Sequence, residues 1–199
     1  MKGRPEDYLG YDEYLCEKFD MTIEEMYRDH PIFKTRNSEI INIMRMYPSP
    51  SKIFEFACTY GFLALEILKQ FPNVDYTCTN FLQDVVDYVE NQGVKTFLWD
   101  ATLMPFANMK KYDTFICTSM EHLKNDRFII KSLPKDSVLY FCATDMNDKT
   151  HFWRFRDENE IRDRYINHLK ITDLKTIKID QTRKKVIGRG IINGNNRLY

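Results

Sequence analysis

Glycine and proline are scarce in this chain, with seven of each among 199 residues. This scarcity excludes collagen-like and low-complexity sequences, and a hydrophobic content of 43% argues against extensive disorder. No stretch approaches the roughly 20 consecutive apolar residues of a membrane-spanning helix, and the polar, acidic residues after Met1 do not resemble a signal peptide. We therefore expect a globular chain that lies in the cytoplasm and does not associate with membranes.

Cysteine is also scarce, with five residues and no Cys-x-x-Cys pair. An odd number without paired spacing argues against a secreted disulfide framework and favours a reducing compartment. Four cysteines fall in or just after predicted strands, which raises the hypothesis of a metal site: Cys58, Cys78, Cys117 and Cys142. Side chains on separate strands need not converge, and cysteine is often simply a small buried residue. We therefore predict no metal site.

A net charge is absent as well, since 29 basic residues balance 29 acidic ones. The charges are unevenly distributed: residues 1–30 carry nine acidic and four basic side chains, whereas residues 175–199 carry seven basic side chains and the single acid Asp180. A basic edge could meet an anionic substrate, but charged edge strands more commonly serve solubility. Without an overall positive field, a nucleic-acid partner is not expected.

The first 50 residues are predicted to form a helical extension that covers the rest of the fold or acts as a lid. Thr22 and Glu25 have the spacing of a capping box, at the start of a helix that Pro31 ends. A second helix follows, with its N-cap at Asn37 or Ser38. Three tyrosines ahead of these helices could help the extension close over a ligand, although aromatic helix faces are more often core: Tyr8, Tyr11 and Tyr14.

From residue 51 to residue 199, short apolar runs alternate with amphipathic segments, which predicts a doubly wound α/β domain. Strands are expected at 53–56, 75–81, 94–100, 111–119 and 137–145, and helices at 62–71, 82–93, 126–133 and 155–169. The first five strands should be parallel. Two further strand-like runs, 174–180 and 184–193, are joined by a short polar turn and predict a terminal antiparallel hairpin.

Ligands of an open parallel sheet bind beyond the carboxyl ends of its strands. The first strand is followed by a turn that contains the small residues Ala57 and Gly61, after which a helix begins; these residues could admit a ligand or serve only close packing. Asn80, after the second strand, could bind a ribose diol or cap a helix, and Phe81 could stack on a ligand or join the core. Asp100, after the third, could accept a hydrogen bond from an exocyclic amine or be a plain loop carboxylate.

Together these segments resemble the class I S-adenosylmethionine-dependent methyltransferases, over about three-quarters of the chain from Lys52 onward. IFEFACTYGFLALEIL resembles the family's first motif, FLWDATLMPF the segment with the adenine-facing acid, and KYDTFICTSMEHLKND the strand-four segment with its EHL motif. HFWRFRDENEIRDRY resembles the helix start before the final hairpin. Ala57 and Thr59 stand where the family usually has glycines, and Asn80 where it usually has an acid. The resemblance implies a Rossmann-like sheet and S-adenosylmethionine as cofactor, with S-adenosylhomocysteine as product.

The resemblance also implies a role for each matching position. Glu55 would orient the methionine amine, and the turn would wrap the cofactor through Ala57, Cys58, Thr59 and Gly61. Asn80 would hold the ribose.

The remaining cofactor contacts would come from the third and fourth strand ends. Phe81 would pack on adenine, Asp100 would accept from its amine, and Ala101 would contact the ring through its backbone. Thr118 and Met120 would line the side of the sulfonium.

For catalysis we predict His122, because histidine titrates near physiological pH and the EHL position lies at the cofactor end of the sheet. A purely structural role for this histidine is an equally good interpretation. His151 is a weaker second candidate. The expected acceptor is a small molecule or a sugar-like hydroxyl or amine.

Two other functions remain open. The first is a catalytically inactive methyltransferase fold that recruits a protein partner, which the altered positions Thr59 and Asn80 suggest. The second is a dinucleotide-binding oxidoreductase, although ACTYGF lacks the Gly-x-Gly-x-x-Gly turn that such an enzyme would need.

Overall fold

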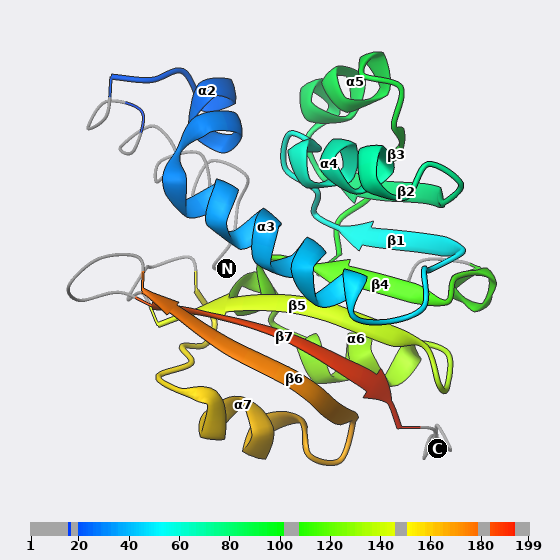
Figure 1. The fold of residues 1–199 in the computed structure, drawn as a ribbon, viewed down its shortest axis with the longest axis vertical. Coiled ribbons are helices and arrows are strands. Elements are labelled where there is room, and N and C mark those ends of the chain that lie inside the picture. The colour runs from blue at the N-terminus through cyan, green and yellow to red at the C-terminus, as the bar shows by residue number, and fades with distance from the viewer. Residues whose placement is uncertain (1–15, 17–19, 102–107, 146–150, 179–183, 194–199) are drawn as a thin grey trace.

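The computed structural model describes residues 16, 20–101, 108–145, 151–178 and 184–193. Its centre is a seven-stranded sheet in the order β3-β2-β1-β4-β5-β7-β6 (Figure 1). The first five strands pair in parallel, and β7 pairs antiparallel with both β5 and β6. The strands are β1 (Lys52–Phe56), β2 (Asp75–Asn80), β3 (Lys95–Leu98), β4 (Thr114–Cys117), β5 (Val138–Thr144), β6 (Leu169–Lys178) and β7 (Lys184–Ile192). The predicted mainly parallel sheet with a terminal antiparallel pair is confirmed.

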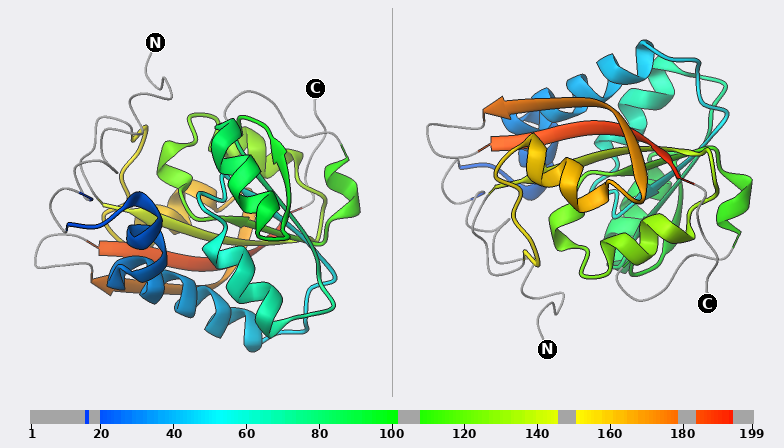
Figure 2. Two further views of the ribbon diagram at one scale, coloured as in Figure 1. Left: turned by 90° about the horizontal axis from the view of Figure 1, so that it is seen from above. Right: turned by 90° about the horizontal axis from the view of Figure 1, so that it is seen from below.

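Helices cover both faces of this sheet (Figure 2). The α-helices are α2 (Ile23–Asp29), α3 (Pro31–Arg45), α4 (Phe62–Gln70), α5 (Gln83–Asn91), α6 (Asp126–Ser132) and α7 (Glu158–Tyr165). Two short 3₁₀ turns, η1 (Met109–Lys111) and η2 (Met120–His122), flank β4.

Alternating side chains of the strands form two hydrophobic cores, one on each face. One core joins α3, α4 and α5 to the strand residues Ile53, Cys78, Ile116, Tyr140, Cys142 and Ile187. The other joins α6 and α7 to Phe54, Phe56, Phe115, Cys117, Leu139, Phe141 and Val186. Because neighbouring residues point to opposite faces, the continuous apolar runs of the sequence are those of strands buried on both sides.

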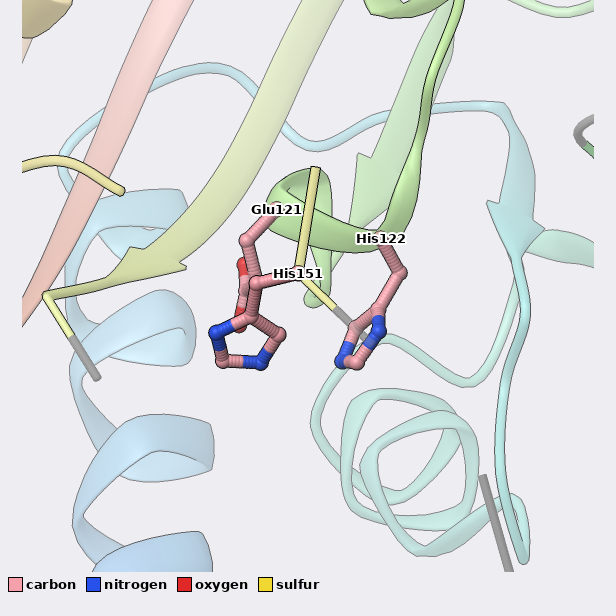
Figure 3. A group of neighbouring side chains, drawn as sticks. All are labelled: Glu121, His122 and His151. Atoms are coloured by element: carbon pink, nitrogen blue, oxygen red, sulfur yellow. The ribbon is translucent and has the colours of Figure 1, made fainter. Parts of the chain in front are cut away.

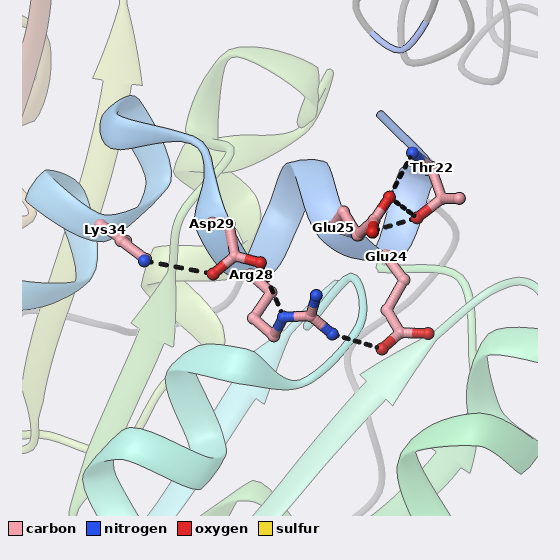
Figure 4. A network of polar contacts seen from close by, with 6 residues as sticks. All are labelled: Thr22, Glu24, Glu25, Arg28, Asp29 and Lys34. Carbon is pink, nitrogen blue, oxygen red and sulfur yellow. Dashed lines mark hydrogen bonds and ion pairs between the residues drawn. The ribbon is translucent and has the colours of Figure 1, made fainter. Parts of the chain in front are cut away.

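The capping box at Thr22 is confirmed. The Thr22 hydroxyl accepts a hydrogen bond from the Glu25 amide at 3.2 Å, and Glu25 Oε2 accepts one from the Thr22 amide at 2.9 Å (Figure 4). Further along the helix, Arg28 pairs with Glu24 at 2.9 Å and with Asp29 at 2.8 Å. These exposed ion pairs add to the polar contacts within α2.

The predicted start of α3 is wrong. The helix begins at Pro31, with His30 as its N-cap: Nδ1 of His30 accepts a hydrogen bond from the Ile32 amide at 3.3 Å. Proline is favoured in the first helical turn because backbone N–H groups have no carbonyl partner in the helix there, so the lack of an N–H costs nothing. Pro31 therefore begins α3 directly after the end of α2. Asn37, expected as a cap, is a buried residue inside the helix, where its Oδ1 accepts from Arg36.

A second boundary also differs. The helix expected to reach residue 169 ends at Tyr165, and β6 already begins at Leu169. Asp157 is the N-cap of this helix as predicted, because its carboxylate accepts from the amides of Asn159 and Glu160. The predicted turn at residues 181–183 lies outside the described residues, as do Tyr8, Tyr11 and Tyr14.

Two features bear on how the chain is organised. α3 packs against the same core as α4 and α5, so this part of the N-terminal 50 residues covers the sheet. Within the described ranges, no helix is both long and apolar enough to cross a membrane. The cytoplasmic location stays a prediction.

Candidate functional site

The parallel strands β1 to β4 end at one edge of the sheet, so the segments that follow them lie together there. They carry the residues predicted to hold the cofactor. The fold thus brings to one edge the turn 57–61, the segments 80–82 and 99–101, and η2 with its preceding residues.

The turn after β1 has an unusual backbone. Ala57 and Thr59 adopt positive φ angles of 51° and 50°, and Gly61, the N-cap of α4, has a φ of 71°. Positive φ is strained for residues with a Cβ, most of all for β-branched ones. Three alternate positions of the turn thus adopt a backbone conformation that suits glycine, although only Gly61 is a glycine.

Gly61 is required for a second reason. A Cβ atom at this position would lie 2.9 Å from Cγ1 of Val89, in α5. The turn is also tied to its neighbouring strand, because the Cys58 amide donates to the Thr79 carbonyl at 2.9 Å. Both close packing and a positive φ thus require glycine at position 61. A role of this turn in packing does not exclude a role in admitting a ligand.

Glu55, near the end of β1, is buried. Its Oε2 accepts a hydrogen bond from the Tyr76 hydroxyl at 2.8 Å. Burial raises the pKa of Glu55 to about 7, while the Tyr76 hydrogen bond and the positive charge of Arg36 act in the opposite direction. This carboxyl group lies near the carboxyl end of β1, where a nearby cationic amine would stabilise its charged form.

Asn80 ends β2 and is buried. Its Oδ1 accepts from the Leu82 amide at 3.0 Å, and the N-cap of α5 is Leu82, so Asn80 shapes the turn before the helix without capping it. The amide nitrogen of Asn80 is the atom left to donate to a ribose hydroxyl. Phe81, next to it, is half-buried.

Asp100 and Ala101 follow β3. The Trp99 amide donates to the Asn80 carbonyl at 2.7 Å, which holds this segment beside the end of β2. Asp100 is half-buried and Ala101 is buried. The segments expected to contact ribose and adenine therefore adjoin, while residues 102–107 lie outside the described part of the chain.

The segment after β4 divides into two parts. Thr118 and Met120 are buried, and Met120 belongs to the core beneath α6 and α7. His122 is half-buried, and its ring lies edge-on to that of His151, with centroids 4.6 Å apart. The two histidines considered separately in the sequence thus meet at one place.

Sequence reasoning did not single out Glu121 as a candidate site residue. Its carboxylate lies with the rings of His122 and His151, so that one ligand atom of each residue falls within 4.8 Å of the others (Figure 3). The EHL motif contained the signal for Glu121, but nothing in the sequence indicated that His151, some 30 residues later, would complete the group.

The cysteines do not form such a group among the residues that the structure describes. Cys117 lies in the core beneath α6 and α7, whereas Cys58, Cys78 and Cys142 lie in the core of the opposite face. Burial raises the pKa of Cys117 and of Cys142 above the ordinary value, which keeps these thiols protonated.

No protein-family model matches this sequence, and no curated protein matches it. Solved structures do match. The N-methyltransferase NodS from Bradyrhizobium japonicum, in complex with S-adenosylhomocysteine, superposes with a TM-score of 0.67 at 10% identity, over 83% of this chain and 90% of that one. A TehB-like SAM-dependent methyltransferase from Corynebacterium glutamicum gives 0.62 at 15% identity, over 92% and 99%.

A third similar structure is the 1,6-didemethyltoxoflavin-N1-methyltransferase of Burkholderia thailandensis, with 1,6-didemethyltoxoflavin and S-adenosylhomocysteine bound. Its TM-score is 0.65 at 10% identity, over 96% of this chain and 91% of that one. At such low identity the comparison establishes the fold, and the strand order and antiparallel end agree with it. This chain has the Rossmann-like fold of the class I S-adenosylmethionine-dependent methyltransferases.

Proposed function

We propose that this protein is an S-adenosylmethionine-dependent methyltransferase that acts on a small-molecule or sugar-like acceptor. The observation that carries the proposal is the turn after β1, where Ala57 and Thr59 share the positive φ of Gly61. Keeping two strained residues in this conformation costs stability, about 1–2 kcal/mol each. Such strain persists chiefly where function needs it.

The residues at the strand ends fit the cofactor. Glu55 would attract the methionine amine, and the Asn80 amide nitrogen would donate to the ribose. Phe81 would face the adenine ring, with Asp100 accepting from the adenine amine and Ala101 packing against it. Similar structures support this assignment, because two of those described above contain S-adenosylhomocysteine.

The turn after β1, residues 57–61, and the end of β4 would lie on either side of the reacting methyl group. The acceptor's lone pair attacks the methyl carbon in line with the carbon–sulfur bond, which breaks and releases S-adenosylhomocysteine. A hydroxyl or amine acceptor also loses a proton, which passes to His122 or to solvent. Thr118 and Met120 would lie on the sulfonium side of this reaction, and His122 would act on the acceptor side.

Isothermal titration of the protein with S-adenosylmethionine and S-adenosylhomocysteine tests the proposal. We expect micromolar binding of both, weakened at least about tenfold in Asp100→Ala through loss of a hydrogen bond to the adenine amine. Asp75→Ala is the matched control, because Asp75 is exposed at the start of β2, away from the strand ends that hold the cofactor. Saturable binding of a reduced nicotinamide cofactor would instead favour an oxidoreductase.

A catalytically inactive module that recruits a protein partner is the second candidate. It is favoured by Asn80, an uncharged amide whose oxygen already accepts from the Leu82 amide, because such a group offers the ribose weaker hydrogen bonds than a carboxylate would. This candidate predicts no heat with either ligand at millimolar concentration. Tight binding that Asp100→Ala abolishes would contradict it.

A further inference from the structure

We propose that Glu121, His122 and His151 form a binding site for one divalent transition-metal ion. One carboxylate oxygen and one nitrogen from each ring lie within 4.8 Å of one another, and the three side chains lie side by side below η2 (Figure 3). Ligands of a metal at about 2.1 Å are about 3.0–3.4 Å apart. A small inward movement of the side chains would therefore complete the coordination.

The backbone holds the two parts of this group together. The Phe152 amide donates to the Glu121 carbonyl at 2.9 Å, and Nε1 of Trp153 donates to the Leu123 carbonyl at 2.9 Å. These two bonds fasten the segment that carries His151 to the turn that carries Glu121 and His122. Hydrogen bonds of the folded chain therefore hold the three side chains together, since the two segments are far apart in the sequence.

A second observation points to a cation. Glu121 is only 3% exposed, and its Oε2 atom accepts no hydrogen bond from any residue that the structure describes. Burying a carboxylate oxygen without a partner is costly. Lys185, His151 and Arg36 favour the charged form of this carboxylate electrostatically. A bound cation would satisfy this oxygen.

The donor set indicates which ion. Two imidazoles with one carboxylate suit Zn²⁺, Co²⁺, Fe²⁺ or Mn²⁺, whereas Mg²⁺ and Ca²⁺ prefer oxygen ligands alone. Three protein ligands also leave coordination positions open, which is the pattern of catalytic rather than structural metal sites.

The role of the ion rests on the proposed function. Because η2 follows β4 at the cofactor edge of the sheet, the open positions would receive an oxygen of the acceptor. Coordination lowers the pKa of a hydroxyl, so its proton leaves to solvent before the oxygen attacks the methyl carbon. His122 would then act on the acceptor through the ion, and the acceptor class would be one with a metal-binding hydroxyl.

Titration of the untagged full chain with Co²⁺, followed by visible absorbance, tests the site without any cofactor. We expect one equivalent bound at micromolar strength, and at least about tenfold weaker binding in each of Glu121→Gln, His122→Ala and His151→Ala. His168→Ala is the matched control, because this histidine lies in the turn before β6, near the positive charges of Lys131 and Arg127. Circular dichroism of each variant reports whether it is folded, and Glu121→Gln keeps the shape of the native side chain.

Each outcome is decisive. Binding that is absent at millimolar Co²⁺, or that is unchanged in the three variants, would overturn the metal site. Sulfur-to-cobalt charge-transfer absorption would also overturn it, because it would identify cysteine ligands. Cofactor binding is measured separately, so a protein that binds S-adenosylhomocysteine but no Co²⁺ refutes only the metal site, and the reverse result refutes only the methyltransferase.

Discussion

The Tyr76 hydroxyl donates a hydrogen bond of 2.8 Å to Glu55 Oε2 between two adjacent parallel strands, where both side chains are buried. Burial raises the pKa of Tyr76 well above the ordinary value, so the tyrosine remains a donor at any physiological pH. The carboxyl group is different, because its pKa of about 7 places its titration near neutrality. The protonation of this one buried group, near the carboxyl end of β1, is thus linked to the stability of the fold.

We predict that Glu55 makes the protein less stable as the pH rises from about 4.5 to 7. The folded-state pKa lies above the unfolded value of 4.5, so the folded state binds more protons in this window, and the stability present below pH 4.5 is lost as the pH passes 7. The shift corresponds to about 3 kcal/mol. Urea unfolding of the cofactor-free protein across this range measures it.

Glu55→Gln is the matched variant, because glutamine keeps the acceptor for Tyr76 and does not titrate. Its free energy of unfolding should rise relative to wild type as the pH increases from 4.5 to 7.5. Two parallel stability curves would show that Glu55 does not titrate in this window. Other raised carboxyls, such as Glu66, affect both proteins equally and cancel in the comparison.

Thr59→Gly should stabilise the protein despite adding a glycine. Relief of a positive φ at a β-branched residue is worth about 1–2 kcal/mol, against a cost of about 0.4–1 kcal/mol for the more flexible unfolded chain. We therefore expect a gain of up to about 1.5 kcal/mol, measured by urea unfolding. A loss of stability would mean that the Thr59 side chain makes contacts that outweigh its strain.

Gly61→Ala provides the opposite case in the same turn. Its Cβ would combine a φ of 71° with a 2.9 Å contact to Val89. We expect a loss of about 2 kcal/mol or more, from backbone strain and overpacking together. Equal effects of the two substitutions would contradict the account of this turn.

The sheet could be predicted because its information is local. The central strands are short runs whose alternate residues fill two cores, and the starts of two helices are marked by their capping residues, Thr22 and Asp157. Boundaries failed where one residue has two uses. Pro31 ends one helix and begins the next, and the apolar pattern through Leu169 continues from helix into strand.

The group at Glu121 could not be predicted, because it depends on tertiary hydrogen bonds. The position of His151 is fixed by Phe152 and Trp153 contacting the backbone of residues 121 and 123. No spacing in the sequence encodes such a contact. The positive φ at Ala57 and Thr59 does not follow from their residue types, which normally avoid it; the only signal was that glycines usually stand at these positions in the family that the sequence resembles.

Asn80→Asp should strengthen cofactor binding. A carboxylate would still accept from the Leu82 amide through one oxygen and would offer the second, charged oxygen to the ribose hydroxyls. We expect a several-fold lower dissociation constant for S-adenosylhomocysteine by isothermal titration. Asn91→Asp, at the end of α5, is the control for a change of net charge. If both variants bind like wild type, Asn80 does not contact the ribose.

We predict that Arg164 helps to position His151 in the proposed metal site, although it does not belong to the site itself. Its guanidinium pairs with the buried carboxylate of Asp126, with Nε to Oδ2 at 2.8 Å, and lies 3.1 Å from the centre of the Trp153 ring. Trp153 in turn donates to the Leu123 carbonyl. Arg164 thus holds the segment that carries His151.

Arg164→Met keeps the length of the side chain but leaves Asp126 without its cationic partner, and the Tyr165 hydroxyl then remains as a donor to that carboxylate. We expect a loss of about 3 kcal/mol in unfolding free energy, because a buried charge loses its counter-ion. Co²⁺ affinity should fall in the folded variant, since Trp153 loses the group stacked on it.

The double variant Asp126→Asn/Arg164→Met separates the two effects. It removes the unpaired charge and should recover stability. The Co²⁺ affinity should stay low, because the stacking on Trp153 is still missing. Recovery of both would show that Arg164 acts only through the charge of Asp126.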